Sequence, residues 1–401
     1  MVACTRKSHA PALTTSPTSP SPPVREPQSQ GAGRFAWIDW YRGLACILMF
    51  QTHAYDAWTR EPYRDGLYWD IARMQLGGFP ARMFLFLAGV SLMLRYSGDA
   101  RRGVPPGQAR LGALWRGCEV LLYGLLFRLA EWLLSGGDAK NIPELFKVDI
   151  LNCIGVSLMI CALVVPPRRH PKLPVPGIAA VASLVVVFAT PIIQRWPWPA
   201  WLPPAIAAYL WDGTPLGTFP QLPFVAYTLS GAVVGSYWLH SASQGRLARA
   251  LSWSGLLGIA LAIAIQWGNR RGYALFAPSP NVPIPAFPSS FGYRLGMCLA
   301  LGGLSYAWTA WRGSAGFSPL RTLGQASLLV YVVHVEMVYG RLTWSLHHRL
   351  HPLWVTLLIG ILCALMVALA WVRVERVDPW LRAWRKGKAA GPPSSPRQAS
   401  A

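Results

Sequence analysis

The sequence predicts an all-α polytopic integral membrane protein of about ten transmembrane helices, with the N- and C-termini in the cytoplasm. The composition is the first indication, because 53% of the 401 residues are hydrophobic and 20 are Trp. The mean hydropathy is also positive, at +0.31. The second indication is a series of apolar runs, and the third is the placement of Lys and Arg between those runs.

The apolar runs recur along most of the chain, and each is close to the length of about 20 residues that crosses a bilayer. They are separated by short polar connections, so the chain cannot be divided into soluble domains by its length. We expect one helix for each run, at 37–57, 78–96, 111–134, 148–166, 176–194, 217–239, 247–267, 290–311, 322–342 and 353–373.

The two ends of the chain differ from this central domain, which covers 37–385. Residues 1–36 are rich in Ser, Pro, Thr and Gln and have no apolar core, so we expect a disordered tail and not a cleaved signal peptide. Residues 386–401 form a similar polar segment, predicted as a second disordered tail.

The net charge of +21 would suggest nucleic acid in a soluble protein. No basic recognition helix or zinc-ligand spacing accompanies the charge, so we expect no nucleic-acid partner. Most of the 37 Lys and Arg residues fall in alternate connections, together with both tails. The positive-inside rule therefore places both termini in the cytoplasm and requires an even number of spans.

Metal binding is not predicted. The seven Cys residues show no paired spacing of the kind that binds a metal or forms a redox site, and we expect them to be small packing residues. His347, His348 and His351 follow one another in a short connection. Neighbours on a loop rarely offer tetrahedral geometry without a nearby carboxylate or cysteine, so we assign no metal to them.

The first apolar run carries the most informative pair of residues, Arg42 and His53. A spacing of eleven residues puts both side chains on one helix face, about 16 Å apart along the axis. Asp56 follows His53 by three residues and can orient its imidazole as a general base. The alternative is that Arg42 reaches the headgroups and pairs with Asp39 while His53 lies at the opposite interface.

The third run contains two pairs at helix-neighbour spacing, Arg116 with Glu119 and Arg128 with Glu131. Ionisable residues inside a membrane span are functional candidates by default. They can equally be structural ion pairs that allow charged residues to pack between helices. The sequence leaves both interpretations open.

Two further groups of polar residues lie in apolar runs. Asp149 and Asn152 stand at the start of the fourth run, and His334 and Glu336 stand in the ninth. His334 and Glu336 are two residues apart and point to different helix faces, so they do not form a dyad. We expect His334 to be a pocket or structural residue and not the primary base.

These residues occur in blocks that resemble the bacterial membrane proteins with a heparan-α-glucosaminide N-acetyltransferase catalytic domain. The resemblance extends over most of the chain, and six blocks in the same order make it more specific than the Arg–His spacing alone. The blocks are IDWYRGLA (38–45) with His53 and Asp56; FLFLAGVS (84–91); RGCE (116–119) with Phe127 and Arg128; VDILN (148–152); FPQLPF (219–224); and LGQASL (323–328) with Tyr331 and His334.

The resemblance implies an enzyme of the bacterial inner membrane that transfers an acyl group, usually acetyl, from cytoplasmic acyl-CoA to a sugar amine or hydroxyl of an envelope glycan or lipid-linked sugar. By position His53 is the catalytic histidine, with Asp56 beside it, and Arg42 belongs to the acyl-donor path. One departure is Arg82, which stands where a small or apolar residue is expected. We assign Arg128 to the acyl-CoA site and the following residues to the substrate pocket: Glu119, Asp149, Asn152 and His334.

The mechanism and two other functions stay open at this point. His53 can deprotonate the acceptor for direct attack or carry the acyl group covalently. The main alternative function is a proton-coupled transporter of a small solute or lipid-linked sugar, with the buried charges as a proton relay. The second alternative function is that of a non-catalytic family member, which acts as a scaffold for partner enzymes.

Overall fold

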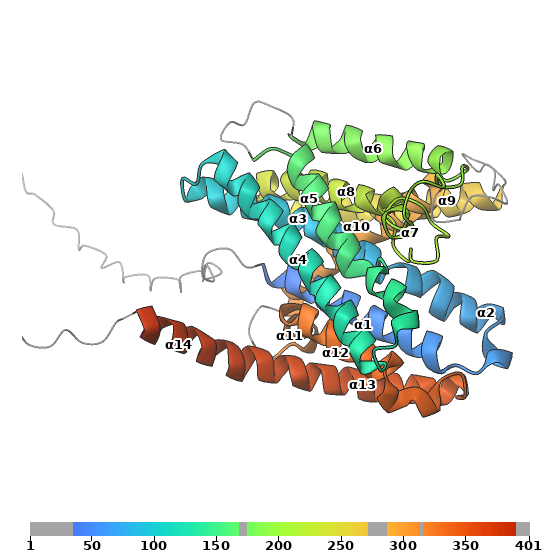
Figure 1. Ribbon diagram of the computed structural model, residues 1–401. Coiled ribbons are helices and arrows are strands. Elements are labelled where there is room, and N and C mark those ends of the chain that lie inside the picture. The colour runs from blue at the N-terminus through green and yellow to red at the C-terminus, as the bar shows by residue number, and fades with distance from the viewer. Residues whose placement is uncertain (1–34, 168–174, 272–286, 313–315, 390–401) are drawn as a thin grey trace, which may run out of the picture. The chain divides into compact units, whose positions relative to one another are not determined.

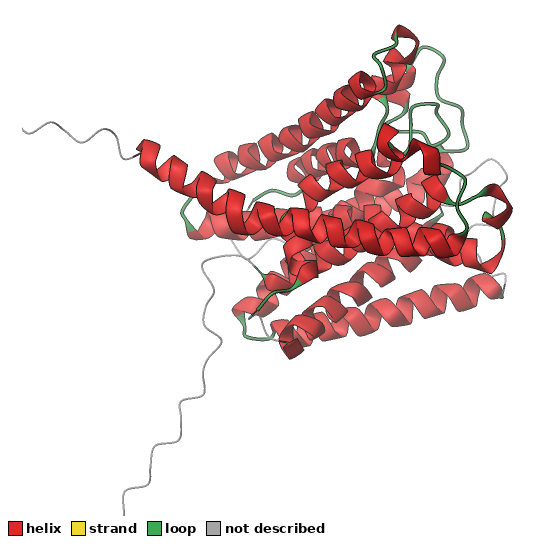
Figure 2. Cartoon of the chain, turned by 90° about the horizontal axis from the view of Figure 1, so that it is seen from below, coloured by secondary structure: helices red, strands yellow, loops and turns green. Residues whose placement is uncertain are grey.

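The computed structural model describes residues 35–167, 175–271, 287–312 and 316–389, and these ranges are helical with no strand among them (Figure 2). Of the two predicted tails, residues 1–34 and 390–401 lie outside the described ranges. The prediction of an all-helical chain is confirmed for the described part.

Every predicted apolar run contains a helix, although the ninth run is divided. The long helices are α1 (Ala36–Trp58), α3 (Pro80–Arg101), α4 (Pro106–Leu134), α5 (Ile150–Val164), α6 (Val175–Ile193), α8 (Gln221–Ser243), α9 (Leu247–Arg270), α10 (Pro288–Arg312), α12 (Ser327–Tyr339) and α13 (Pro352–Val372) (Figure 1). Shorter helices were not predicted, namely α2 (Gly66–Trp69), α7 (Pro204–Ala207), α11 (Pro319–Gln325) and α14 (Asp378–Ala389).

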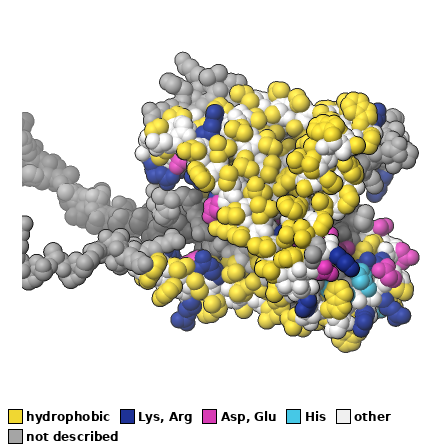
Figure 3. Space-filling model, viewed as in Figure 1, with side chains coloured by type: hydrophobic (Ala, Val, Ile, Leu, Met, Phe, Trp, Pro, Cys, Tyr) yellow, Lys and Arg dark blue, Asp and Glu magenta, His cyan; other side chains and the backbone are white. Residues whose placement is uncertain are grey.

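Four of the described helical segments are long and apolar enough to cross a membrane: Gly66–Arg101, Gln221–Ser243, Leu247–Arg270 and Pro352–Trp384. Large apolar side chains also cover much of the outer surface of α4, α6, α9 and α13. Figure 3 shows this apolar surface, with charged and His side chains gathered near the ends of the helices. A continuous apolar exterior of this kind is typical of a surface that faces lipid.

The contact between α1 and α11 depends on two glycines. A Cβ on Gly43 of α1 would lie 1.8 Å from the carbonyl oxygen of Leu320, and a Cβ on Gly324 of α11 would lie 1.8 Å from that of Asp39. Both distances are far below van der Waals contact, so only glycine allows α1 and α11 to approach this closely. Small residues have the same role at helix contacts in membranes generally.

The ninth apolar run is interrupted at Ala326, whose φ of −110° and ψ of 21° separate α11 from α12. Gln325, the last residue of α11, donates from Nε2 to Oδ2 of Asp39 on α1 at 3.4 Å. The interruption lets α11 pack tightly on the first part of α1 while α12 follows its later part.

The end of α1 is joined by backbone hydrogen bonds to the segment before α13 and by a side-chain hydrogen bond to the end of α12. The N–H of Leu350 donates to the Trp58 carbonyl at 2.9 Å, and the N–H of Arg60 donates to the Leu350 carbonyl at 2.9 Å. The indole Nε1 of Trp58 donates to the carbonyl of Val338 on α12 at 3.1 Å. The carbonyls of Trp58 and Val338 lie in the last turns of α1 and α12, where a helix supplies no partner of its own. The bonds hold the end of α1 against α12 and against the segment before α13.

Candidate functional site

A pair of imidazoles lies where α1 and α12 meet. Nδ1 of His53 on α1 is 2.9 Å from Nε2 of His334 on α12. The ring planes differ by 11° and the ring centroids are 5.1 Å apart. The centroid separation is close to the nitrogen–nitrogen distance plus the two ring radii. The rings therefore meet edge to edge, in the geometry of an in-plane hydrogen bond and not of a face-to-face stack.

The tautomers of both rings follow from the hydrogen bond between His334 and the backbone carbonyl of Val330. Nδ1 of His334 lies 2.9 Å from the carbonyl oxygen of Val330, which can only accept. When both rings are neutral, Nδ1 of His334 therefore carries its proton and Nε2 accepts. Nδ1 of His53 must then be the donor in the pair. Nε2 is consequently the basic nitrogen of His53.

Burial makes this arrangement rigid. His334 has no solvent-exposed surface and packs against the rings of Phe50 and Tyr331, with centroid distances of 4.8 and 5.7 Å. His53 is partly buried. The buried histidine is thus held by protein contacts on every side that the structure describes, and it fixes the ring of the more accessible one.

Asp56 lies one turn beyond His53 on α1. Its Oδ2 accepts a hydrogen bond of 2.9 Å from the hydroxyl of Tyr339, the last residue of α12. The ring of Tyr339 also contacts the ring of His53, at a centroid distance of 5.5 Å. Asp56 and His53 therefore share Tyr339 as a neighbour. The predicted role of Asp56 in orienting His53 stays a prediction.

Tyr339 is one of the residues that line a cavity of about 520 Å³. Its lining combines carboxylates, an arginine and an indole, which is a suitable set for a polar ligand such as a sugar. The side chains come from the end of α4 and from the end of α12 with the segment after it: Glu131, Ser135, Glu336, Tyr339, Arg341 and Trp344, together with Leu134, Val335 and Gly340.

Arg42 occupies a second polar cluster, three turns earlier on α1. Its Nη2 donates to the hydroxyl of Ser91 on α3 at 2.6 Å. Its Nη1 lies 3.5 Å from Oδ1 of Asp39, which is 2% exposed, whereas Arg42 itself is 29% exposed. The pairing with Asp39 that the sequence suggested is confirmed. The guanidinium is both held in place and accessible.

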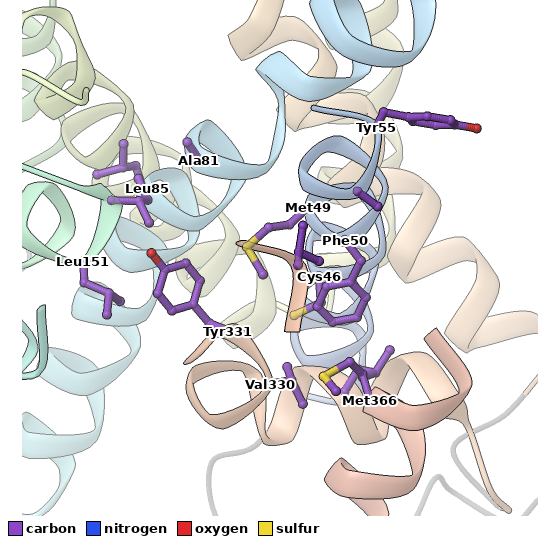
Figure 4. Packing of buried hydrophobic residues seen from close by; sticks show 14 of the residues in the cluster. Cys46, Met49, Phe50, Tyr55, Ala81, Leu85, Leu151, Val330, Tyr331 and Met366 are labelled. Carbon is purple, nitrogen blue, oxygen red and sulfur yellow. The ribbon is translucent and has the colours of Figure 1, made fainter. Parts of the chain in front are cut away.

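The α1 face that Arg42 and His53 share is packed with other side chains between the two residues. Cys46 and Met49, which share the face, are 0% and 4% exposed. With Phe50 they belong to a core that includes Tyr331 and Val330 of α12 (Figure 4). The residues on this face are apolar and of matching size, so they fill the space between the helices when no ligand is present.

Arg128 on α4 forms a buried ion pair with Asp149. Nε of Arg128 lies 3.2 Å from Oδ2 of Asp149, and the side chains are 13% and 5% exposed. Oδ1 of Asp149 accepts from the N–H groups of Leu151 and Asn152, at 3.0 and 3.4 Å, and so caps the N-terminus of α5. Both residues have a clear structural role whatever their function. Arg128 also pairs with Glu131 at 2.6 Å, as the sequence predicted.

The other two predicted pocket residues lie in different surroundings. Asn152 donates from Nδ2 to the hydroxyl of Tyr209 at 3.4 Å and is 1% exposed. Glu119 is 45% exposed and pairs with Arg116 at 2.7 Å. Neither lines the cavity at Tyr339. Their assignment to a substrate pocket is not supported by any contact described above and stays a prediction.

Two features of the site were not predicted from the sequence. The contact between His53 and His334 joins positions 281 residues apart, and the segment between them gives no local signal for it. Tyr339 was not selected because a Tyr at the end of an apolar helix is most often an interface residue. No group of three or more His, Cys, Asp or Glu side chains among the described residues is arranged to hold a metal ion.

Comparisons with known proteins agree with the resemblance seen in the blocks. The model of the family described as "Heparan-alpha-glucosaminide N-acetyltransferase, catalytic" matches residues 34–266, which is more than half of the chain. The match includes Arg42, His53, Asp56 and Arg128, whereas His334 lies beyond it. No curated protein matches the chain.

Proposed function

Because this chain belongs to the heparan-alpha-glucosaminide N-acetyltransferase catalytic family, we propose that it is a membrane-embedded acyltransferase with His53 as its catalytic residue. The donor is an acyl-CoA, with acetyl-CoA as the expected form. The acceptor is a sugar amine or hydroxyl of an envelope glycan or a lipid-linked sugar.

The observation that carries this proposal is the hydrogen bond between Nδ1 of His53 and Nε2 of His334. It directs the basic lone pair of His53 to Nε2 and holds the ring in one orientation. A general base needs both properties. The carbonyl of Val330 completes the chain, because it keeps the proton of His334 on the opposite nitrogen.

The chemistry can follow two routes from this nitrogen. In direct transfer, Nε2 of His53 takes a proton from the acceptor as its nitrogen or oxygen attacks the thioester carbonyl, the carbon–sulfur bond breaks, and the imidazolium returns the proton to the thiolate of CoA. In the covalent route, Nε2 attacks the thioester carbonyl, the carbon–sulfur bond breaks and CoA leaves as its thiolate. The acceptor nitrogen or oxygen then displaces Nε2 from the acyl group, and the acceptor's proton passes to the thiolate. Both routes use the same tautomer.

The donor and acceptor have separate binding regions in this proposal. Arg42 is accessible and fixed by Ser91, which suits the phosphates of CoA, because guanidinium groups bind phosphate through paired hydrogen bonds. The cavity at Tyr339 suits the acceptor, since its carboxylates can hold sugar hydroxyls or an amine. Arg128 remains a second candidate for the donor site.

The thioester can reach His53 only if the packed α1 face opens. Met49 and Cys46 lie between the two regions and are buried. Met is flexible and adapts its shape at low cost, so we propose that Met49 turns aside when the pantetheine arm enters. The arm then replaces the apolar contacts that Met49 gives up.

We further propose that all ten predicted runs cross the bacterial inner membrane, with both termini in the cytoplasm. Each run contains a helix, and Lys and Arg are concentrated on one side of the proposed topology. Arg42 then lies near the cytoplasm, where acyl-CoA is found, and His53 lies near the opposite face. The acyl group would cross most of the bilayer between them.

The test is acyl transfer by purified protein in detergent. Wild-type protein and His53→Ala are incubated with radiolabelled acetyl-CoA and a panel of amino sugars and envelope glycans. We expect label to appear in an acceptor for wild type only, with a rate lower by about 10²–10⁴-fold in the variant. Equal rates would exclude His53 as the catalytic residue.

The same experiment separates the enzyme from a transporter. An enzyme consumes acetyl-CoA even when no membrane separates two compartments. A transporter in detergent micelles does not consume it. Absence of transfer by well-folded wild type with every acceptor, together with solute uptake in proteoliposomes, would favour the transporter.

A further inference from the structure

Arg82 is a buried cation that the proposed reaction does not use. It lies in the first turn of α3 and is only 7% exposed. Its guanidinium lies over the ring of Phe224 on α8, 4.9 Å from the centroid, and is 6.0 Å from that of Tyr227. Its Nη1 donates to the carbonyl of Gly78. Aromatic faces offset part of the cost of burying a cation, but they supply no negative charge.

A second arginine, Arg294 of α10, also lies against Gly78. Its Nε and Nη2 lie 3.0 and 3.1 Å from the position that a Cβ on Gly78 would take. Arg82 and Arg294 are thus both against Gly78, and each lies in the electrostatic field of the other. Two like charges close together repel strongly where water is scarce.

The two arginines have no carboxylate within ion-pair distance in the described part of the chain. Neither arginine forms an ion pair with an acid of the described residues, and the connection at 272–286 contains no Asp or Glu. Asp212, in the connection before α8, interacts electrostatically with Arg82 without forming an ion pair with it. Burial raises the pKa of the Asp212 carboxyl above its usual range, although the Gly213 N–H and the charge of Arg82 act in the opposite direction.

One donor of the pair also lacks a partner. Nε of Arg82 is buried and makes no hydrogen bond with the described residues. A buried donor without a partner costs about 1–3 kcal/mol, and more when it is charged. Arg294 is less deeply buried than Arg82.

We propose that Arg82 and Arg294 form a binding site for an oxyanion, such as the phosphate or sulfate group of a small ligand or of a lipid headgroup. The two guanidinium groups supply the positive charge, and the hydroxyl of Ser290, to which Arg294 donates, lies beside them. The proposal does not depend on the acyltransferase activity.

The helices around the site favour the same charge. Arg82, Phe224 and Ser290 lie within the first two turns of α3, α8 and α10, respectively. The positive ends of three helix dipoles therefore meet at the arginines. An anion bound there would satisfy the guanidinium donors and remove their mutual repulsion.

The experiment measures thermal unfolding of the full chain in a neutral detergent. Sodium phosphate is titrated against sodium chloride at equal ionic strength, and a parallel series compares nanodiscs of phosphatidylcholine alone with nanodiscs that also contain phosphatidylglycerol. We expect one of the two anion sources to raise the apparent Tm of wild type by on the order of 2–4 °C. A response to phosphate identifies a free anion, and a response only to phosphatidylglycerol identifies a headgroup.

The variants are Arg82→Gln and Arg294→Gln, with Arg312→Gln as the control. Arg312 lies at the other end of α10, is exposed, and also stacks on Trp rings. We expect Arg294→Gln to unfold at a higher temperature than wild type without anion, because it removes the repulsion, and to lose the response.

The outcome for each protein decides the proposal. A response that survives in both Arg82→Gln and Arg294→Gln would overturn it, as would a wild type that responds to neither source. If Arg82→Gln fails to fold, the response of Arg294→Gln still decides. Arg312→Gln must respond like wild type, since loss of its response would show a general effect of surface charge.

Discussion

His334 donates through Nδ1 to its own helix and accepts through Nε2 from His53, so that one buried ring determines the orientation of a catalytic candidate on another helix. Catalytic and metal-binding histidines are commonly oriented by a carboxylate or a carbonyl. Here a neutral imidazole takes that position, and the carbonyl of Val330 acts one step further away.

This relay predicts different results for two variants of His334. In His334→Ala, Nδ1 of His53 loses its acceptor, and we expect kcat for acetyl transfer to fall by about 10–100-fold, as is usual for residues that orient a functional histidine. His334→Asn should recover part of the loss, because its amide oxygen can accept. Steady-state kinetics on purified protein would measure both, and an unchanged kcat in His334→Ala would disprove the relay.

The donor-site role of Arg42 predicts a change in KM. We expect Arg42→Ala to raise the KM for acetyl-CoA by roughly 10–100-fold, the equivalent of a lost charge-assisted hydrogen bond, with a smaller effect on kcat. Arg42→Lys should lie between, since it keeps the charge and loses the planar geometry. Arg271→Ala at the end of α9 is the control. An unchanged KM in Arg42→Ala would remove this residue from the donor site.

The buried pair of Arg128 and Asp149 predicts a large loss of stability. Arg128→Ala leaves the carboxylate of Asp149, 5% exposed, without its cation, which costs about 3–5 kcal/mol. Lys147→Ala breaks an exposed pair with Glu144, in the connection between α4 and α5, and should cost about 0–1 kcal/mol. Thermal unfolding of both in the same detergent makes the comparison. Similar Tm values for the two would contradict the importance of burial.

The close approach of α1 and α11 predicts a specific sensitivity to one methyl group. Gly43→Ala places a Cβ against the Leu320 carbonyl and should destabilise the protein by about 1–3 kcal/mol or more. Gly98→Ala is the matched control on α3, where a Cβ would meet nothing within 4 Å. That change should be neutral or slightly stabilising, because Ala is the better helix former. Equal effects would show that α1 and α11 are less close than described.

The sequence predicted the helices well because their signal is local. Each apolar run contains a helix, because a continuous apolar stretch of this length is itself the signal for a buried or membrane-spanning helix. The interruption at Ala326 was missed because neither Gly nor Pro occupies that position. Two residues before it, Gly324 packs against the Asp39 carbonyl of α1, a contact between segments far apart in the sequence.

The site was predictable only in part, for a similar reason. Arg42, Asp39 and the pairs in α4 depend on neighbours three residues away, so spacing reveals them. The partner of His53 depends on how α12 packs, and the packing of Met49 and Cys46 between two polar clusters depends on which side chains fill a space. Neither feature can be predicted from the residues of a single segment, because each depends on two segments that are distant in the sequence.

The packed face of α1 bears on the ion permeability of the membrane that contains this protein. In the proposed topology, ionisable groups approach both surfaces of an energised membrane, and a water-filled passage between them would dissipate its electrochemical gradient. The thiol, thioether and phenyl groups of Cys46, Met49 and Phe50 form an insulating layer in which a hydrated ion has no stable position. With this face packed, the protein can therefore lie in an energised membrane without conducting ions across it.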